Sequence, residues 1–242
     1  MSIRAVTGTA QRVLLQLRQD PRTIALIVVV PCALMVLLKY VFASGDTFDR
    51  IGAPLLGVFP LLSMFLVTSI AMLRERTTGT LERLLAMPIT KLDILGGYAL
   101  AFAAAAVVQA TLVSAVAFGF LDLHVDGAHW GVLLLAIANA VLGMALGLLV
   151  SAFAKTEFQA VQFLPAFILP QFMICGLLTP RGNMARPLEW ISNGAPMTYA
   201  YGALDQVSRG EGSALAGDVA AIAGFTLLAL VLGALTLRRR TT

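Results

Sequence analysis

The sequence predicts an all-α integral membrane protein with six transmembrane helices. Hydrophobic residues make up 59% of the 242 residues and charged residues only 12%, whereas soluble domains are about half apolar and about a quarter charged. Charge-poor stretches of about 20 residues, the length of a helix that crosses about 30 Å of hydrocarbon, recur along the whole chain. We interpret residues 1–242 as one transmembrane domain with three further segments: an N-terminal interfacial helix (1–20), a short cytoplasmic helix (74–90) and an outer re-entrant helical hairpin (179–218).

The N-terminal segment is predicted to be an amphipathic helix on the inner leaflet. Its apolar residues fall on one arc of the helix, and basic and amide residues fill the rest. The arc consists of Val6, Ala10, Val13, Leu14 and Leu17. The alternative is a solvated basic tail. Asp20-Pro21 ends the helix, because the residue before a proline is pushed out of helical geometry.

Hydropathy places the six spans at residues 23–42, 51–73, 94–120, 132–153, 158–178 and 219–237. The third stretch is longer than a bilayer requires, so we expect it to tilt or to emerge at one end. In the fourth, Gly143 and Gly147 have the spacing that lets two helix backbones approach closely. In the fifth, Pro165 and Pro170 predict a bend.

The distribution of Lys and Arg predicts the orientation of the spans. Most of the 17 basic residues lie before the first span, in the loops after the second and fourth spans, and after the sixth. Basic loops stay in the cytoplasm, so both termini are predicted to be cytoplasmic and the protein to lie in the cell membrane. Because the basic residues flank apolar runs and do not form one basic face, we expect a lipid bilayer as partner and no nucleic acid.

The cytoplasmic segment 74–90 contains a second amphipathic pattern. Leu81, Leu84 and Leu85 recur at helical spacing, Pro88 limits the helix, and Gly79 permits a sharp turn after the second span. Charged residues flank the stripe, so its apolar face is suited to a groove on another protein. A connector helix that only rests on the membrane surface explains the pattern equally well.

Four amide side chains inside the spans are candidates for a substrate path. They are Gln109, Asn139, Gln162 and Gln171. Amides in hydrocarbon face other helices or a cavity, because exposure to lipid leaves them unpaired. Hydrogen bonding between helices, without any contact to substrate, is the alternative for each of them.

The outer segment 179–218 mixes apolar residues with Asn, Gly and Pro and is too broken to span the membrane. Two short helices that dip into the outer leaflet fit this composition, with aromatic residues as interfacial anchors. Trp190, Asn193, Pro196 and Tyr199 are the candidate outer-gate residues. An ordinary surface loop is the alternative.

Two motifs in their order along the chain resemble one known family. Residues 75–88, ERTTGTLERLLAMP, are similar to the coupling segment of the ABC type-2 exporter permeases, and they lie between the same two spans. Residues 176–203, GLLTPRGNMARPLEWISNGAPMTYAYGA, are similar to the family's segment between its last two spans. Residues 17–22 weakly resemble the start of the family's first span, and together the three stretches lie within the same six-span order.

The resemblance implies a permease subunit that pairs with a second permease subunit and docks two copies of a cytoplasmic ABC ATPase. It assigns the ATPase-coupling role to a set of residues in the cytoplasmic segment. The set is Glu75, Arg76, Gly79, Thr80, Leu81, Glu82, Leu84 and Leu85. The short loop after Gly176, with Arg181 and Arg186, departs from the family pattern and leaves the shape of the outer gate open.

The chain lacks the residues of an ATPase. A phosphate-binding loop needs Gly-x-x-x-x-Gly-Lys-Ser/Thr, and none of the three lysines follows such a loop. We therefore predict no cofactor and no catalytic residue in this chain, with ATP and Mg²⁺ on the partner. His124 and His129, with nearby aspartates, could form a metal site, but we interpret them as loop residues.

Two other classes of membrane protein fit the sequence less well. An ion-coupled carrier needs acidic or histidine residues within the spans, and a membrane enzyme needs a nucleophile with a base, and the spans contain neither. The nearly uncharged spans favour export of a lipophilic or amphiphilic, drug-like substrate. Lipid or polysaccharide export by the same family is the alternative.

Overall fold

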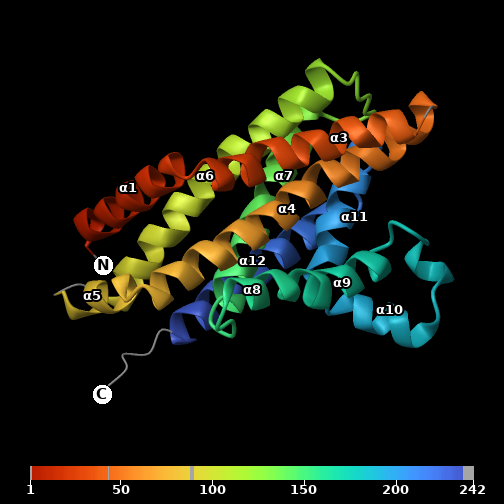
Figure 1. Cartoon of the computed structure of the whole chain (residues 1–242). Coiled ribbons are helices and arrows are strands. Elements are labelled where there is room, and N and C mark those ends of the chain that lie inside the picture. Colours follow the sequence, from red (N-terminus) through yellow and green to blue (C-terminus); the bar gives the residue numbers. More distant parts are fainter. Residues whose placement is uncertain (1, 43, 88–89, 237–242) are drawn as a thin grey trace.

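The computed structural model describes residues 2–42, 44–87 and 90–236, and all regular structure in these residues is helical. Five helices in the described part are long and apolar enough to cross a membrane. They are Pro21–Val41, Gly45–Thr77, Lys91–Gly119, His129–Val150 and Leu215–Thr236. They correspond to the first, second, third, fourth and sixth predicted spans, which confirms an all-α membrane protein (Figure 1).

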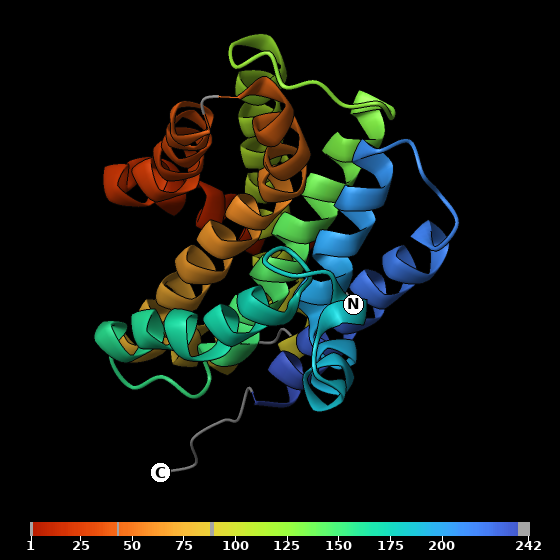
Figure 2. The same ribbon diagram turned by 90° about the vertical axis from the view of Figure 1, so that its right-hand side faces the viewer.

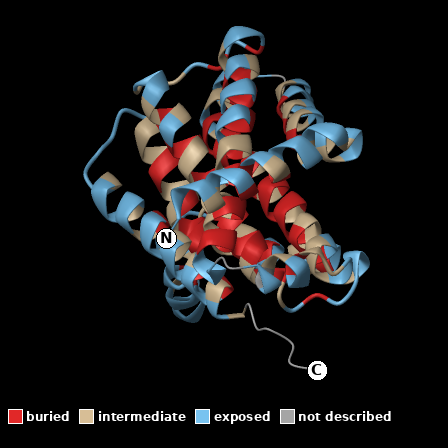
Figure 3. Cartoon of the chain, turned by 90° about the vertical axis from the view of Figure 1, so that its left-hand side faces the viewer, coloured by how far each residue is buried: buried red, intermediate tan, exposed pale blue. Residues whose placement is uncertain are grey.

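The centre of the bundle is formed by α4 (Gly45–Thr77), α7 (His129–Val150) and α11 (Pro196–Ser208), which lie side by side (Figure 2). A Cβ atom added to Gly143 of α7 would lie 2.2 Å from the carbonyl oxygen of Leu61 of α4, and one on Gly147 would lie 2.4 Å from that of Phe65. The two backbones therefore touch where the sequence predicts close packing. Buried residues gather along this centre, and the outward faces of the surrounding helices are exposed (Figure 3).

Prolines interrupt two of the helical stretches with π-helical turns. The first span consists of α2 (Pro21–Ile24), the π segment η1 (Ala25–Val29) and α3 (Val30–Val41), with Pro31 just after the π turn. Proline cannot donate a backbone hydrogen bond, and a local π adjustment accommodates the missing donor.

The fifth predicted span is built in the same way, from α8 (Glu157–Phe163), η2 (Leu164–Ile168) and α9 (Leu169–Ile174). The π segment contains Pro165, and Pro170 follows it in the first turn of α9. The helical stretch ends at Ile174, four residues before the predicted end at residue 178, and it is not among the five long apolar helices. A sixth crossing therefore stays a prediction.

The remaining long helices begin before their predicted starts. α4 begins six residues before the predicted start and continues four residues past the predicted end, because polar first and last turns can lie outside the hydrocarbon. α6 (Lys91–Gly119) begins at a capping box in which Thr90 and Asp93 satisfy each other's backbone groups. α12 (Leu215–Thr236) begins four residues early, and the predicted end at residue 237 lies outside the described residues.

The N-terminal helix α1 (Ile3–Gln19) packs along the start of α6. Ala10 and Val13 of the predicted apolar arc are buried, so much of the arc faces the protein's own helices instead of lipid, whereas Leu14 stays exposed. Asp20 ends the helix and accepts hydrogen bonds from the backbone of Arg22 and Thr23. The start of α1, the end of α12 and the short helix α5 (Thr80–Ala86) lie at the same end of the molecule (Figure 1).

The outer segment contains the short 3-10 helix η3 (Arg181–Asn183), α10 (Arg186–Asn193) and α11. The two α-helices differ in environment. α11 is packed among α4, α7 and α12, whereas α10 lies at the edge of the molecule and contacts α9 and α11. The two are joined by a tight turn at Gly194 and Ala195.

Candidate functional site

The candidate coupling site lies at the end of α4 and in α5. α4 continues to Thr77, so Glu75 and Arg76 belong to its last turn and not to the separate short helix that the sequence predicts. The chain then reverses at Gly79, whose φ of 73° and ψ of 5° lie in the left-handed region that glycine adopts without strain. The turn predicted at this glycine is therefore present, and α5 follows it directly.

The leucine stripe of α5 faces the protein's own core. Leu81 is only 5% exposed and belongs to a buried cluster with Met72 and Ile94, and Leu84 packs partly against the same cluster. The side chain of Leu85 lies outside the described residues. Leu81 and Leu84 thus hold α5 on the bundle within one chain, which agrees with the connector alternative, and the docking of this stripe into another protein stays a prediction.

The outward face of α5 is polar at its start and apolar at its end. Glu82 and Arg83 are exposed, and so are Ala86 and Met87, the latter 51% exposed. These four residues form what we call the outer face of α5. Any protein that binds α5 in this conformation must contact this face. Thr80 is half-buried, and its hydroxyl lies 3.1 Å from that of Thr78 across the turn.

Glu75 is bound within the chain. Its carboxylate pairs with the Arg12 guanidinium of α1 at 3.4 Å, and the same guanidinium donates to the hydroxyl of Tyr98 on α6. The Glu75 side chain is only 12% exposed. Glu75 therefore joins α4 to α1 and α6. Its predicted role at the ATPase stays a prediction.

Arg76, the neighbour of Glu75, is half-buried. Its Nε atom is inaccessible to solvent and has no hydrogen-bond partner among the described residues. A buried donor without a partner destabilises the arrangement that contains it. The predicted role of Arg76 at the ATPase stays a prediction.

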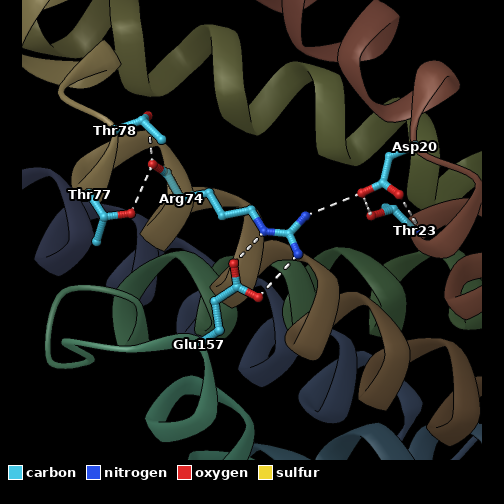
Figure 4. A network of polar contacts seen from close by, with 6 residues as sticks. All are labelled: Asp20, Thr23, Arg74, Thr77, Thr78 and Glu157. Atoms are coloured by element: carbon cyan, nitrogen blue, oxygen red, sulfur yellow. Dashed lines mark hydrogen bonds and ion pairs between the residues drawn. The ribbon is translucent and has the colours of Figure 1, made fainter.

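A second network of charges surrounds Arg74, the residue before Glu75 in α4 (Figure 4). Its guanidinium donates to both carboxylate oxygens of Glu157 at the start of α8, at 2.7 and 3.1 Å, and to Asp20 at the end of α1, at 3.2 Å. Thr77 and Thr78 donate to the Arg74 carbonyl and close the end of the helix. One side chain thus connects α1, α4 and α8.

These hydrogen bonds shift the titration of both acids. The Arg74 hydrogen bond lowers the pKa of Glu157 below its ordinary value. The pKa of Asp20 is also lowered, first by the hydrogen bond from the Thr23 hydroxyl and to a lesser degree by the charge of Arg74. Both acids are therefore ionised at neutral pH, and the network is fully charged.

Sequence reasoning missed this network. Asp20, Arg74 and Glu157 are far apart in the chain, and the only shared signal is that each lies at the end of a predicted span that was expected to be cytoplasmic. In the described part of the chain no group of three or more His, Cys, Asp or Glu residues is arranged to hold a metal ion.

Three of the four candidate path residues make bonds inside the bundle. Gln109 of α6 donates to Ser63 of α4, and Asn139 of α7 donates to the Ala200 carbonyl of α11 at 2.9 Å. Gln171 of α9 accepts from the backbone of Met197 at 3.4 Å. All three are buried, so within one chain they have the alternative role of joining helices. The fourth, Gln162, is exposed on α8.

The candidate outer gate is held by Asn193. Its side-chain oxygen accepts from Arg181, and its carbonyl accepts from the Tyr199 hydroxyl at 2.7 Å. Pro196 is buried at the start of α11, whereas Trp190 is 79% exposed on α10. Arg181, which departs from the family pattern, is thus the residue that ties the loop after α9 to the end of α10.

Comparisons with known proteins extend over most of these elements. The sequence profile of the ABC-2 type transporter family matches residues 5–207. The probable multidrug ABC transporter permease YbhR of Escherichia coli is 30% identical over 144 residues, which make up 57% of this chain and 38% of that protein. ABC transporter G family member 20 of Dictyostelium discoideum is 29% identical over 141 residues, 58% of this chain and 19% of that protein.

This chain covers well under half of the length of either relative. The family match is broader, since it runs from α1 through the coupling site and the outer helices almost to the end of α11. The chain therefore belongs to the ABC-2 type transporter family.

Proposed function

We propose that the chain is the membrane-spanning permease subunit of an ATP-driven exporter. The observation that carries the proposal is α5, a short helix at one end of the bundle that keeps Leu81 and Leu84 inward and presents charged residues outward. The family match and the similarity to a probable multidrug permease support it. The ATPase is a separate cytoplasmic subunit in two copies, and ATP and Mg²⁺ bind there.

In this proposal the outer face of α5 is the contact to the ATPase. Glu82 and Arg83 supply charges, and Met87 supplies an apolar contact. Closure of the ATPase around ATP moves α5 as a unit with the end of α4, because Leu81 and Gly79 fix the two helices to each other. Such a contact favours one of two arrangements of the spans, which is the requirement for alternating access.

The assembly needs a second permease subunit, a homodimer or a heterodimer. The helix from Glu157 to Ile174 supports this, because it exposes large apolar residues such as Phe167 and Met173 together with Gln162. Of the four candidate path residues, Gln162 is therefore the one that is exposed, whereas the other three are buried and hydrogen-bonded within the chain. We propose that this helical stretch crosses the cell membrane as the fifth of six spans and that both termini are cytoplasmic.

The substrate is proposed to be lipophilic or amphiphilic and drug-like, moved outward from the cytoplasm or the inner leaflet. The buried polar side chains along the spans are amides and hydroxyls, such as Gln109, which donates to Ser63, and Asn139, which donates to the Ala200 carbonyl, so a highly charged cargo would lack charged partners. Lipid or polysaccharide export remains the second candidate, because the G family relatives carry no substrate in their names. An ion-coupled carrier is the third.

Charge reversal on α5 tests the contact with the ATPase. We expect Glu82→Lys and Arg83→Glu to reduce copurification of the ATPase and substrate-stimulated ATP hydrolysis several-fold, because a rim charge affects association with the partner. The permease should still insert and elute as a single species in gel filtration. The isolated chain should hydrolyse no ATP.

The matched control is Glu211→Lys, which reverses the same type of charge on an exposed residue between α11 and α12. It should leave copurification and hydrolysis unchanged. If both α5 variants keep full copurification and export, α5 is only a connector. Export that persists without any ATPase but collapses with the ion gradient would favour the carrier.

A further inference from the structure

A groove of about 480 Å³ lies between α1 and α6, on a face that neither the coupling site nor the candidate path uses. Its floor is apolar, with Leu14 and Leu15 from α1 and Leu100 and Ala104 from α6. Its rim on α1 carries Gln11 and Arg18. The groove is therefore amphipathic.

The sequence of α6 explains why the groove exists. At Gly97 the two helices are in contact, since a Cβ atom there would lie 2.5 Å from the Cβ of Thr9 and 3.0 Å from the Val6 carbonyl. Farther along α6 residues 103–106 are four consecutive alanines, of which Ala104 lines the groove. The small residues leave room beside α1 that the tight contact at Gly97 does not.

The groove exposes hydrocarbon beside a cation. Leu15 and Leu100 are 50% and 48% exposed. α1 contains Arg4, Arg12 and Arg18 and no acidic residue. Arg12 pairs with Glu75, whereas Arg18 makes no ion pair with any residue that the structure describes. A molecule with a hydrocarbon chain and an anionic head complements both features.

We propose that this groove binds an anionic phospholipid of the inner leaflet. Its acyl chain lies along Leu14, Leu15 and Leu100, and its phosphate lies at Arg18 and Gln11. Basic residues at the cytoplasmic surface attract anionic headgroups. The site fixes α1 to the membrane on one side while Arg12 fixes it to α4 on the other, so the local lipid becomes part of the structure around the coupling site.

Quenching by brominated lipid measures occupancy of the groove directly. The reporter is Leu100→Trp in a chain with Trp130→Phe and Trp190→Phe, reconstituted into phosphatidylcholine vesicles with an added fraction of phosphatidylglycerol. Either lipid carries the bromine label in turn. We expect phosphatidylglycerol to bind about fivefold more strongly than phosphatidylcholine, the factor expected for one basic residue near an anionic surface.

Arg18→Gln should reduce this preference to about one. Arg4→Gln is the matched control, because it removes the same charge from the same helix outside the groove, and it should keep the preference. If both variants lose the preference for phosphatidylglycerol equally, the preference comes from the general charge of the surface. That result would overturn the proposed lipid site. Absence of quenching by either lipid would mean that protein covers the groove, and would overturn it also.

The measurement needs no ATPase and no transport, so its failure is distinguishable from a failure of the proposed export function. If the Leu100 reporter does not fold, Leu15→Trp places the reporter on the opposite wall. The same comparison of the Arg18 and Arg4 variants then decides the outcome.

Discussion

Replacement of Gly79 separates the geometry of the α4–α5 turn from the chemistry of its surface. A Cβ atom at this position would have no heavy atom within 4 Å, so a substitution meets no steric obstacle. Its φ of 73° is nevertheless unfavourable for an L-residue, and a left-handed conformation costs about 1–2 kcal/mol for most of them. Part of this is offset, because alanine restricts the unfolded chain by about 0.4–1 kcal/mol more than glycine.

For Gly79→Ala we therefore expect a net penalty of about 1 kcal/mol. This corresponds to about a fivefold shift in the equilibrium between α5 packed on the bundle and α5 detached from it. Gly79→Asn should shift the equilibrium less, because asparagine tolerates left-handed geometry better than other residues with a side chain. The order glycine, asparagine, alanine is the signature of a backbone effect. A contact of the side chain with a partner would give no such order.

Hydrogen exchange of the purified permease measures the shift. Protection of the amides of Arg83, Leu84 and Ala86, which is set by the free energy of local opening, should fall about fivefold in the alanine variant. The amides of α7 should be unchanged. In the assembled transporter, the same variants should lose transport per ATP hydrolysed in the same order.

Gly8→Ala is the control for the chemical change itself. This glycine also has open space around its Cβ position, but it lies within α1, where alanine is favoured by about 0.5–1 kcal/mol. It should raise or keep stability. Unchanged protection in Gly79→Ala, or equal loss in the alanine and asparagine variants, would refute the reasoning from backbone geometry.

Three further predictions concern the charge network, the helix packing and the topology. A double-mutant cycle with Arg74→Gln and Glu157→Gln should give a coupling of about 0.5–1 kcal/mol in thermal unfolding, because both side chains are about half exposed. Pairing lowers the pKa of Glu157. The stabilisation from the pair should therefore be complete above the unfolded pKa of about 4.3 and disappear only as the pH falls below that value. Coupling that persists at pH 2 would contradict the assignment. Gly143→Val should destabilise by about 1–3 kcal/mol or more, since even its Cβ would lie 2.2 Å from the Leu61 carbonyl oxygen, whereas Gly217→Val, which meets nothing within 4 Å, serves as the control. In a chain without Cys32 and Cys175, Thr78→Cys should resist an impermeant thiol reagent applied to intact cells and His124→Cys should react; external labelling of Thr78→Cys would reverse the proposed orientation.

Hydropathy and local chemistry predicted most of the helices but not what covers them. The spacing of Leu81 and Leu84 indicates correctly that they share a face of a short helix, and Gly79 indicates the turn before it. The pattern contains no information on whether that face meets another protein or the same chain. Here the turn at Gly79 folds α5 back onto Met72 and Ile94, so its own core covers the leucines.

The same limit applies to the buried polar residues: the sequence shows that they need partners but not which partners they find. The sequence indicates that Gln109, Asn139 and Gln171 need partners, because an unpaired amide in hydrocarbon is unfavourable. Which partner each finds depends on the rotation of one helix against another, and the structure pairs them with Ser63, Ala200 and Met197. Arg74 and Glu157, 83 residues apart, are likewise beyond the reach of any local pattern.

The contrast between these contacts indicates where the bundle is able to move. The contact of α4 with α7 is made by backbones that touch at Gly143 and Gly147, and packed interiors of this kind resist deformation. α1 and α8 are instead joined to α4 by side-chain ion pairs. The pairs of Arg74 with Asp20 and Glu157 are partly exposed and therefore weak, whereas Arg12–Glu75, at 3.4 Å, is more buried. Arg74 and Glu75 are consecutive residues just before α5. A displacement of α5 therefore acts on the ion pairs of both residues at once. We therefore expect the transport cycle to change the positions of α1 and α8 relative to α4, while α4 and α7 move together.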